Sequence, residues 1–258
     1  MGGIGKTTLC KKFYHLFHNQ YDKSSFLEDV KSKDNIDDVI KQLLHDLCGK
    51  RLSKDENVNQ DDRDQIRQCM ISEKVLVVVD DVGDLKNLTS LLFIEKGAKN
   101  ATSKSKLLMN CRNWQNLKSN VSEDGKMDMK FLEEKEARKF FMFHAFGDAN
   151  HVPNKDFKNV CIEIIEACKG LPLSLKVLGS FLRNTKELKM WEGVLSKLKS
   201  GKNFTGGNDN EDLWSVLKLS YDPLEPEHKN MFLDIACFLG GLKLSTICRM
   251  WNRDEHPY

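Results

Sequence analysis

The sequence predicts an α/β protein in which a parallel sheet comes first and packed helices follow. Two observations support this prediction. The segment Val75–Val79 is a run of five apolar residues, which is typical of a central parallel strand buried on both faces. From Leu132 onward strand-like segments nearly vanish, and apolar residues recur at helical spacing instead. The expected order is therefore a sheet layer, a helical bundle and an incomplete helical unit at the C-terminal end.

The chain before residue 125 is expected to alternate helices with strands. In 36–47, for example, apolar side chains recur at the spacing of an amphipathic helix. The polar stretch over 49–64 is expected to be a loop. The expected helices are 8–17, 36–47 and 65–73, and the expected strands lie within 24–30, 75–79 and 106–109.

The later part of the chain is expected to be helical throughout. Four of its segments carry an apolar stripe that none of them could bury alone, so they should pack as a bundle. The striped segments are 133–146, 159–170, 173–184 and 191–200, and two further helices are expected within 213–224 and 228–241. The stretch over 200–212 is rich in glycine and asparagine and is expected to be a linker. The predicted domains are 1–125 for the sheet layer, 126–200 for the bundle and 211–258 for a truncated last unit.

Composition favours a globular cytoplasmic protein. Of the 258 residues 40% are hydrophobic and 30% charged, and the net charge of +2 gives no reason to expect a nucleic-acid partner. The eight cysteines form no CxxC pair and suit free thiols in a reducing compartment. No signal peptide is expected at the N-terminus. The apolar stretch MFLDIACFLGGL is too short to span a bilayer and contains Asp234, so no membrane segment is expected.

The opening residues MGGIGKTT contain the last part of a phosphate-binding loop, G-x-x-x-x-G-K-[ST]. Glycine permits the tight turn and the close approach that let backbone amides surround phosphate oxygens. In such a loop Lys6 would reach the β- and γ-phosphates, and the Thr7 hydroxyl would bind Mg²⁺. The plainer interpretation of so short a match is an ordinary glycine turn.

A second motif makes nucleotide binding the stronger interpretation. Asp80 directly follows the buried strand, where a P-loop protein places the carboxylate that helps to hold Mg²⁺. Asp81 is then the candidate to orient an attacking water. The alternative is that the two aspartates only end a strand in a turn.

Two further residues are candidates for the same site. Arg112 comes just after the predicted strand at 106–109, where its guanidinium could bind a γ-phosphate. The alternative is a solvated loop arginine. Pro172 lies at a helix boundary and, from the residues alone, is best explained as the opening residue of the next helix.

Six segments, in this order, resemble the motif series of the NB-ARC domain in plant disease-resistance proteins. They are GGIGKTT, FLEDV, VLVVVDDV, CKGLPLSLKVLG, LKLSYDPL and FLDIACF. SSFLEDVK and FLDIACF are similar to the branch that carries an N-terminal Toll/interleukin-1 receptor (TIR) domain. The resemblance implies a P-loop NTPase sheet, a helical bundle and the start of a winged-helix-like unit. It also implies a switch that holds ADP at rest and ATP when active, with slow hydrolysis at most.

The resemblance also implies roles for individual residues. Asp80 would be the Mg²⁺ aspartate, Asp81 the residue for hydrolysis, Arg112 the phosphate sensor and Pro172 the neighbour of adenine. The phosphate loop would consist of Gly3, Ile4, Gly5, Lys6, Thr7 and Thr8. The implied cofactors are ADP or ATP and Mg²⁺.

The chain departs from the family pattern at several positions. The usual T-T-R is Asn110-Cys111-Arg112, and the usual G-S-R is Lys104-Ser105-Lys106. Gly83 stands near the position where this branch usually carries Asp, with Asp84 following. The first loop glycine would precede Met1, and no strand leads into the loop. We therefore expect a fragment that lacks the leading strand, the TIR and leucine-rich-repeat domains and the later Met-His-Asp motif. Those domains, and further copies of the chain, would be its partners.

Three other functions remain as alternatives to the switch. A truncated, degenerate interaction module would keep the motifs without binding nucleotide. A P-loop metabolic enzyme would need a substrate lid, and no basic cluster or candidate base follows the sheet. The C-terminal unit has mixed charge and no basic stripe, so domain packing is favoured there over DNA binding.

Overall fold

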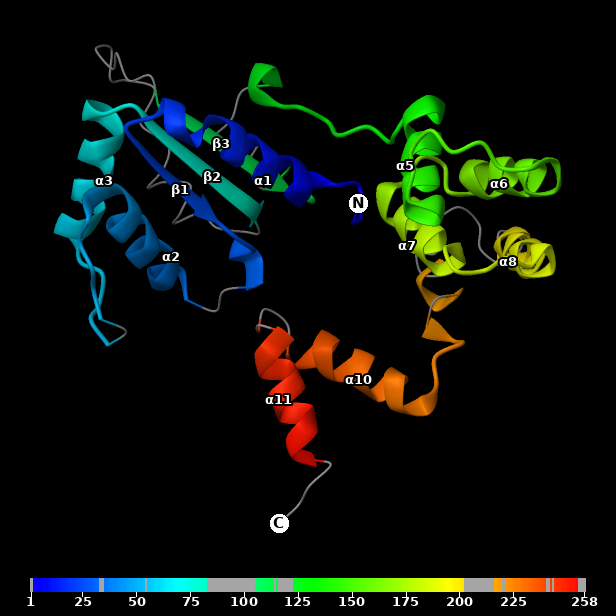
Figure 1. The fold of residues 1–258 in the computed structure, drawn as a ribbon. Helices are drawn as coiled ribbons and strands as arrows, with labels where there is room; N and C mark the ends of the chain where they lie inside the picture. Colours follow the sequence, from blue (N-terminus) through cyan, green and yellow to red (C-terminus); the bar gives the residue numbers. More distant parts are fainter. Residues whose placement is uncertain are drawn as a thin grey trace. The chain divides into compact units, whose positions relative to one another are not determined.

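The computed structural model describes residues 2–32, 35–53, 55–82, 105–113, 115, 123–201, 216–219, 221–239, 242 and 244–254. The chain divides into two compact units, Met1–Lys130 and Phe131–Tyr258 (Figure 1). The first contains α1 (Lys6–Phe17), η1 (His18–Gln20), β1 (Lys23–Leu27), η2 (Val30–Ser32), α2 (Ile36–Leu43), η3 (Leu44–Cys48), α3 (Gln60–Ser72), β2 (Val75–Val82), β3 (Lys106–Cys111) and η5 (Glu123–Gly125). None of the described helices is both long and apolar enough to cross a membrane.

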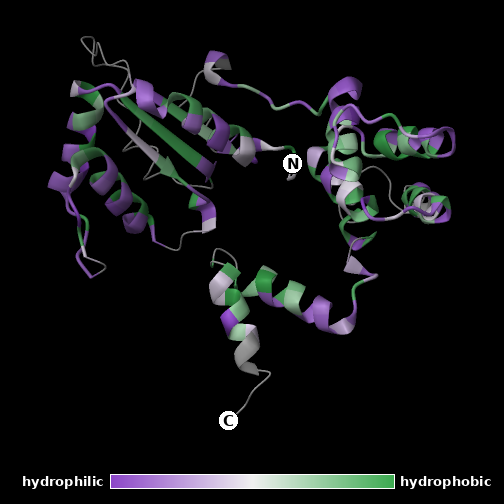
Figure 2. Ribbon diagram, viewed as in Figure 1, coloured by the Kyte–Doolittle hydropathy of each residue, from purple (hydrophilic) through white to green (hydrophobic). Residues whose placement is uncertain are grey.

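The described strands form a parallel sheet in the order β1-β2-β3. Successive side chains of a strand point to opposite faces, and β2 buries both sets. Leu76 and Val78 pack with Cys10 and Phe13 of α1. The other set, which includes Val77, packs with α2, η3 and α3 (Figures 1 and 2). The prediction of a central parallel strand covered on both faces is confirmed.

The expected loop over 49–64 is partly wrong, because α3 already begins at Gln60. Asn59 and Asp62 form a capping box: the Asn59 side chain accepts from the Asp62 amide at 2.9 Å, and the Asp62 carboxylate accepts from the Asn59 amide at 3.0 Å. These bonds satisfy helix amides that otherwise lack partners. Helix formation therefore extends into a segment whose polar composition alone favours a loop.

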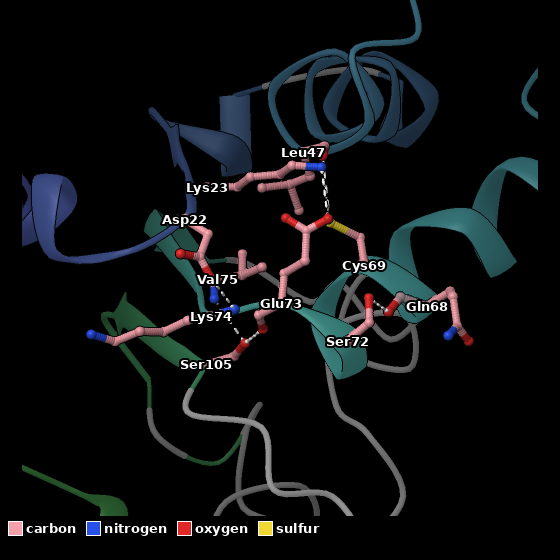
Figure 3. A network of polar contacts seen from close by, with 10 residues as sticks. All are labelled: Asp22, Lys23, Leu47, Gln68, Cys69, Ser72, Glu73, Lys74, Val75 and Ser105. Atoms are coloured by element: carbon pink, nitrogen blue, oxygen red, sulfur yellow. Dashed lines mark hydrogen bonds and ion pairs between the residues drawn. The ribbon is translucent and has the colours of Figure 1, made fainter.

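Ser105 joins three elements at the amino end of the sheet (Figure 3). Its hydroxyl accepts from the Val75 amide at 2.9 Å and contacts the carbonyl oxygens of Glu73 and Met70 at 2.9 and 3.1 Å. The end of α3 and the starts of β2 and β3 are thereby held together. Glu73 also pairs with Lys23 at the start of β1, at 3.0 Å.

The second unit is helical, as predicted. It contains α5 (Glu134–Phe146), α6 (Lys155–Ala167), α7 (Pro172–Leu182), α8 (Leu188–Gly201), α10 (Pro226–Cys237) and α11 (Leu244–Asp254). Trp191 of α8 is 1% exposed and lies against Phe141 of α5 and Phe157 of α6. The α11 helix has no counterpart among the predicted elements. The predicted linker lies largely outside the described residues, as do Gly83, Asp84 and Lys104, and the winged-helix assignment stays a prediction.

Candidate functional site

The opening glycines form a turn directly before α1. Gly3 and Gly5 have φ angles of 75° and 97°, in the left-handed region that glycine adopts without a steric penalty. The helix begins at Lys6, and the Leu9 amide donates to the Gly5 carbonyl at 2.9 Å to close its first turn. Thr7 and Thr8 are exposed in that turn. The amides of this turn and the positive end of α1 are suited to binding an anion.

The carboxyl end of β2 carries both predicted aspartates. Asp80 is only 3% exposed. Asp81 has a φ of 50°, which is uncommon for a residue other than glycine, and the pairing with β3 shifts in register between Val79 and Val82. The backbone is thus irregular at the point where the sequence predicts the chemistry.

Asn110 of β3 connects this irregular end with α1. Its carboxamide nitrogen donates to Asp80 Oδ1 and, at 3.3 Å, to Cys10 Sγ. Its carboxamide oxygen accepts from the Asp81 amide at 3.0 Å. One side chain therefore holds a helix residue, a buried carboxylate and a strained backbone position.

Arg112 and Asp81, which the sequence assigned to separate roles, form an ion pair. The guanidinium donates from Nε and Nη2 to the two carboxylate oxygens at 3.2 and 2.9 Å. The side chain of Arg112 is 60% exposed and that of Asp81 only 14%. A bidentate pair of this kind fixes the orientation of both groups.

A cavity of about 420 Å³ opens beside these residues, within the first unit. Ligand pockets commonly occupy roughly 300–1,000 Å³. Its wall comes from the loop and first turns of α1, the end of β3 and residues 125–129. Of the predicted site residues, Ile4, Lys6 and Arg112 line the cavity.

The other predicted residues do not line the cavity. Asp80 connects to it through Asn110, and Asp81 through Arg112. Pro172 belongs to the second unit, where it is the first residue of α7. Its predicted contact with adenine stays a prediction.

Two thiols near the cavity remain neutral at physiological pH. Burial raises the pKa of Cys10. Burial also raises the pKa of Cys111, against the opposing effect of the nearby Lys6 ammonium. Lys6, Arg112 and Lys126 therefore give the cavity wall its positive charge, which the Asp128 carboxylate opposes and the two thiols do not.

The sequence did not predict that Asn110 or the segment with Met127 and Met129 contributes to the site. Asn110 was noted only as a departure from the family pattern. Met127 and Met129 line the cavity from a segment that was placed at a domain boundary. Their alternation with polar neighbours is the signal that could have revealed an extended segment with one apolar side.

The residues present are suited to a nucleotide with Mg²⁺. The cavity combines an apolar wall with three cationic side chains, those of Lys6, Arg112 and Lys126, and one carboxylate, that of Asp128. It lies next to a turn of backbone amides. The described residues contain no group of three or more His, Cys, Asp or Glu side chains that could hold a metal by themselves. Mg²⁺ usually takes one or two protein carboxylates together with phosphate oxygens.

Comparison with known proteins gives the family. The NB-ARC domain profile matches residues 1–151. The chain is 32% identical over 261 residues to disease resistance protein RPV1 of Vitis rotundifolia, covering all of this chain and 18% of that protein. It is 32% identical over 248 residues to TMV resistance protein N of Nicotiana glutinosa, covering 93% of this chain and 20% of that protein.

The chain thus spans about a fifth of the length of these two relatives. The profile covers more than half of the chain, and the similarity to disease-resistance proteins extends over nearly all of it. The resemblance inferred from the six motifs is confirmed: this chain belongs to the NB-ARC domain family.

Proposed function

We propose that the chain is the nucleotide-binding part of a plant disease-resistance receptor, inactive with ADP and active with ATP. One observation supports this most directly. The chain belongs to a nucleotide-binding family. Its glycine turn leads into α1, and Asn110 of β3 connects α1 with the Asp80–Asp81 end of β2, beside one cavity. That combination suits phosphate and Mg²⁺ better than it suits a purely structural turn.

The residues of α1 and β2 would bind the phosphates and the metal. The amides from Gly3 to Thr8 surround phosphate oxygens, and the Lys6 ammonium binds the β- and γ-phosphates. Thr7 and Asp80 hold Mg²⁺ through their oxygens. When bound, Mg²⁺ neutralises negative charge on the β- and γ-phosphates.

Arg112 would distinguish ATP from ADP. It is engaged by Asp81, and a γ-phosphate would compete for the same guanidinium. Transfer of Arg112 to the phosphate would release Asp81 to orient a water, which is consistent with slow hydrolysis at most. A difference in affinity between two such arrangements is what a nucleotide switch requires.

The remaining assignments concern the rest of the receptor. Pro172 would pack beside adenine, and the TIR and leucine-rich-repeat domains would be intramolecular partners, with self-association between receptor copies. The protein would act in the cytoplasm.

The test is the nucleotide that the purified chain carries, released by denaturation and identified by chromatography. We expect stoichiometric ADP in the wild type and a large loss in Lys6→Arg, because arginine does not reproduce the compact ammonium of lysine. The matched control is Lys12→Arg, the same change at an exposed position of α1.

Two results would contradict the proposed function. Nucleotide content that is the same in Lys6→Arg and Lys12→Arg would remove the role of the loop. A wild-type chain without nucleotide that also fails to bind added ADP would favour the alternative, a degenerate interaction module. The altered Asn110-Cys111-Arg112 segment is the observation in favour of that alternative.

A further inference from the structure

Asn110 uses the hydrogen-bonding capacity of its side chain in three directions. The carboxamide nitrogen donates to both Asp80 Oδ1 and Cys10 Sγ, and the oxygen accepts from the Asp81 amide. Among the described residues, no other side chain donates a hydrogen bond to the Asp80 carboxylate. This amide therefore contributes to the position of that buried carboxylate.

The bond to the Asp81 amide acts at the irregular point of β2. Asp81 has its left-handed φ of 50° where the β2–β3 register shifts. A residue keeps such a conformation only when its surroundings impose it. The bond from the Asp81 amide to Asn110 is one such constraint, and the ion pair of the Asp81 side chain with Arg112 is another.

We propose that Asn110 is a positioning residue of the nucleotide site, which holds Asp80 and Asp81 in place for a Mg²⁺-bound nucleotide. This inference rests on the proposed function. Asn110 acts through the two aspartates, so its effect should be specific for binding that depends on Mg²⁺.

An amide serves this purpose here better than the threonine that the family pattern leads one to expect. A threonine hydroxyl has one hydrogen to donate, whereas the asparagine amide has two. Only the amide can donate to Asp80 and Cys10 together while its oxygen accepts from the Asp81 backbone. Asn110 and Cys10 thus form a matched pair that links β3 to α1.

The first experiment needs no nucleotide. Amide hydrogen exchange is measured by NMR in the wild-type chain, in Asn110→Leu and in the matched control Asn113→Leu. The Asn113 side chain accepts from the local Gln115 amide at 3.0 Å and, within the described residues, contacts neither aspartate. We expect the Asp81 amide to exchange at least about fivefold faster in Asn110→Leu, because the substitution removes the hydrogen bond that this amide donates to Asn110. The Val77 amide in the middle of β2 should be unchanged.

Either of two exchange results would overturn the inference. An unchanged Asp81 amide would show that Asn110 does not hold this position. An equal acceleration at Asp81 and Val77 would show general loosening of β2, which is a structural effect without a positioning role.

The second experiment measures ADP affinity by calorimetry with Mg²⁺ and with EDTA. In Asn110→Leu we expect the gain in affinity from Mg²⁺ to fall by about tenfold or more, with the affinity in EDTA kept within about twofold. Asn110→Thr, which can restore the bond to Asp80 alone, should recover part of the gain. An equal loss of affinity in both buffers would contradict the inference. Failure of the wild type to bind ADP would refute the proposed function, and the exchange data would still decide whether Asn110 holds Asp81.

Discussion

Asp62 and Asp80 are both buried carboxylates, with only 1% and 3% of their surface exposed, yet their surroundings differ. Asp62 pairs with the Lys50 ammonium and accepts from the Asn59 amide at the start of α3. Asp80 accepts from the uncharged amide of Asn110, and within the described parts of the chain it forms no ion pair with a cationic side chain.

Under the proposed function, this difference would distinguish a structural carboxylate, that of Asp62, from a ligand-binding one, that of Asp80. Burying a charge costs free energy unless a partner compensates it. Asp62 has its compensation within the fold, so it stabilises the chain. Among the residues that the structure describes, Asp80 has a hydrogen bond and no opposite charge, and a divalent cation would supply that charge. Proteins commonly tolerate such a cost at sites that bind ligands.

The largest expected effect is on ADP binding, where substitutions of Asp80 and Asp62 should differ in their dependence on Mg²⁺. Asp80→Ala should weaken ADP binding in Mg²⁺ by about tenfold to 100-fold, the loss of a charge-assisted interaction, with little change in EDTA. Asp62→Ala should leave the ratio of the two affinities unchanged. Calorimetric titration in both buffers measures this, and an equal effect of both substitutions on the ratio would remove the distinction.

The next effect concerns stability. Asp62→Ala removes the Asp62 carboxylate from the capping box of α3 and takes away the partner of Lys50. We expect it to lower the free energy of unfolding of the first unit by about 2 kcal/mol. Native-state hydrogen exchange of β2 amides measures this unit by itself. The exposed neighbour Asp61→Ala is the control, and a loss as large as that of Asp62→Ala would contradict the structural role.

Acid should remove the stabilisation that the Asp62 carboxylate provides. The Lys50 ammonium and the Asn59 amide lower the pKa of Asp62 below its ordinary value of 3.8. A carboxyl group with a lowered pKa in the folded state stabilises above its unfolded pKa, and this contribution is lost as the pH falls. Below about pH 4 the wild type should therefore lose stability more steeply than Asp62→Asn. Parallel acid titrations of the two proteins would contradict this.

The smallest effect on stability belongs to Arg112. Its ion pair with Asp81 is largely exposed on the arginine side, so Arg112→Ala should change the free energy of unfolding by less than about 0.5 kcal/mol. The same substitution should weaken binding of a non-hydrolysable ATP analogue more than binding of ADP. Equal weakening of both nucleotides would contradict the sensor role of Arg112.

The sequence predicted the elements whose patterns are strong and local. Val75–Val79 could only be a buried strand, and the apolar stripes after Leu132 required a bundle. The start of α3 was misplaced because it depends on two reciprocal hydrogen bonds between Asn59 and Asp62, which composition does not reveal.

For the site, the motifs predicted residue types but not their contacts. Lys6, Asp80, Asp81 and Arg112 were all selected from the sequence. The bond network of Asn110 and the pairing of Arg112 with Asp81 depend on the register between β2 and β3. A register shift involves residues about 30 positions apart along the chain, and no local pattern encodes it.

The most direct test of the account compares Asp80→Asn with Asp62→Asn in buffer free of Mg²⁺ and nucleotide. Both substitutions remove one buried negative charge and keep an acceptor oxygen, and exchange of the β2 amides gives the stability of the first unit. The account predicts that Asp62→Asn destabilises this unit, whereas Asp80→Asn leaves its stability unchanged or raises it. A loss of stability in Asp80→Asn equal to that in Asp62→Asn would contradict the claim that Asp80 is kept for a ligand.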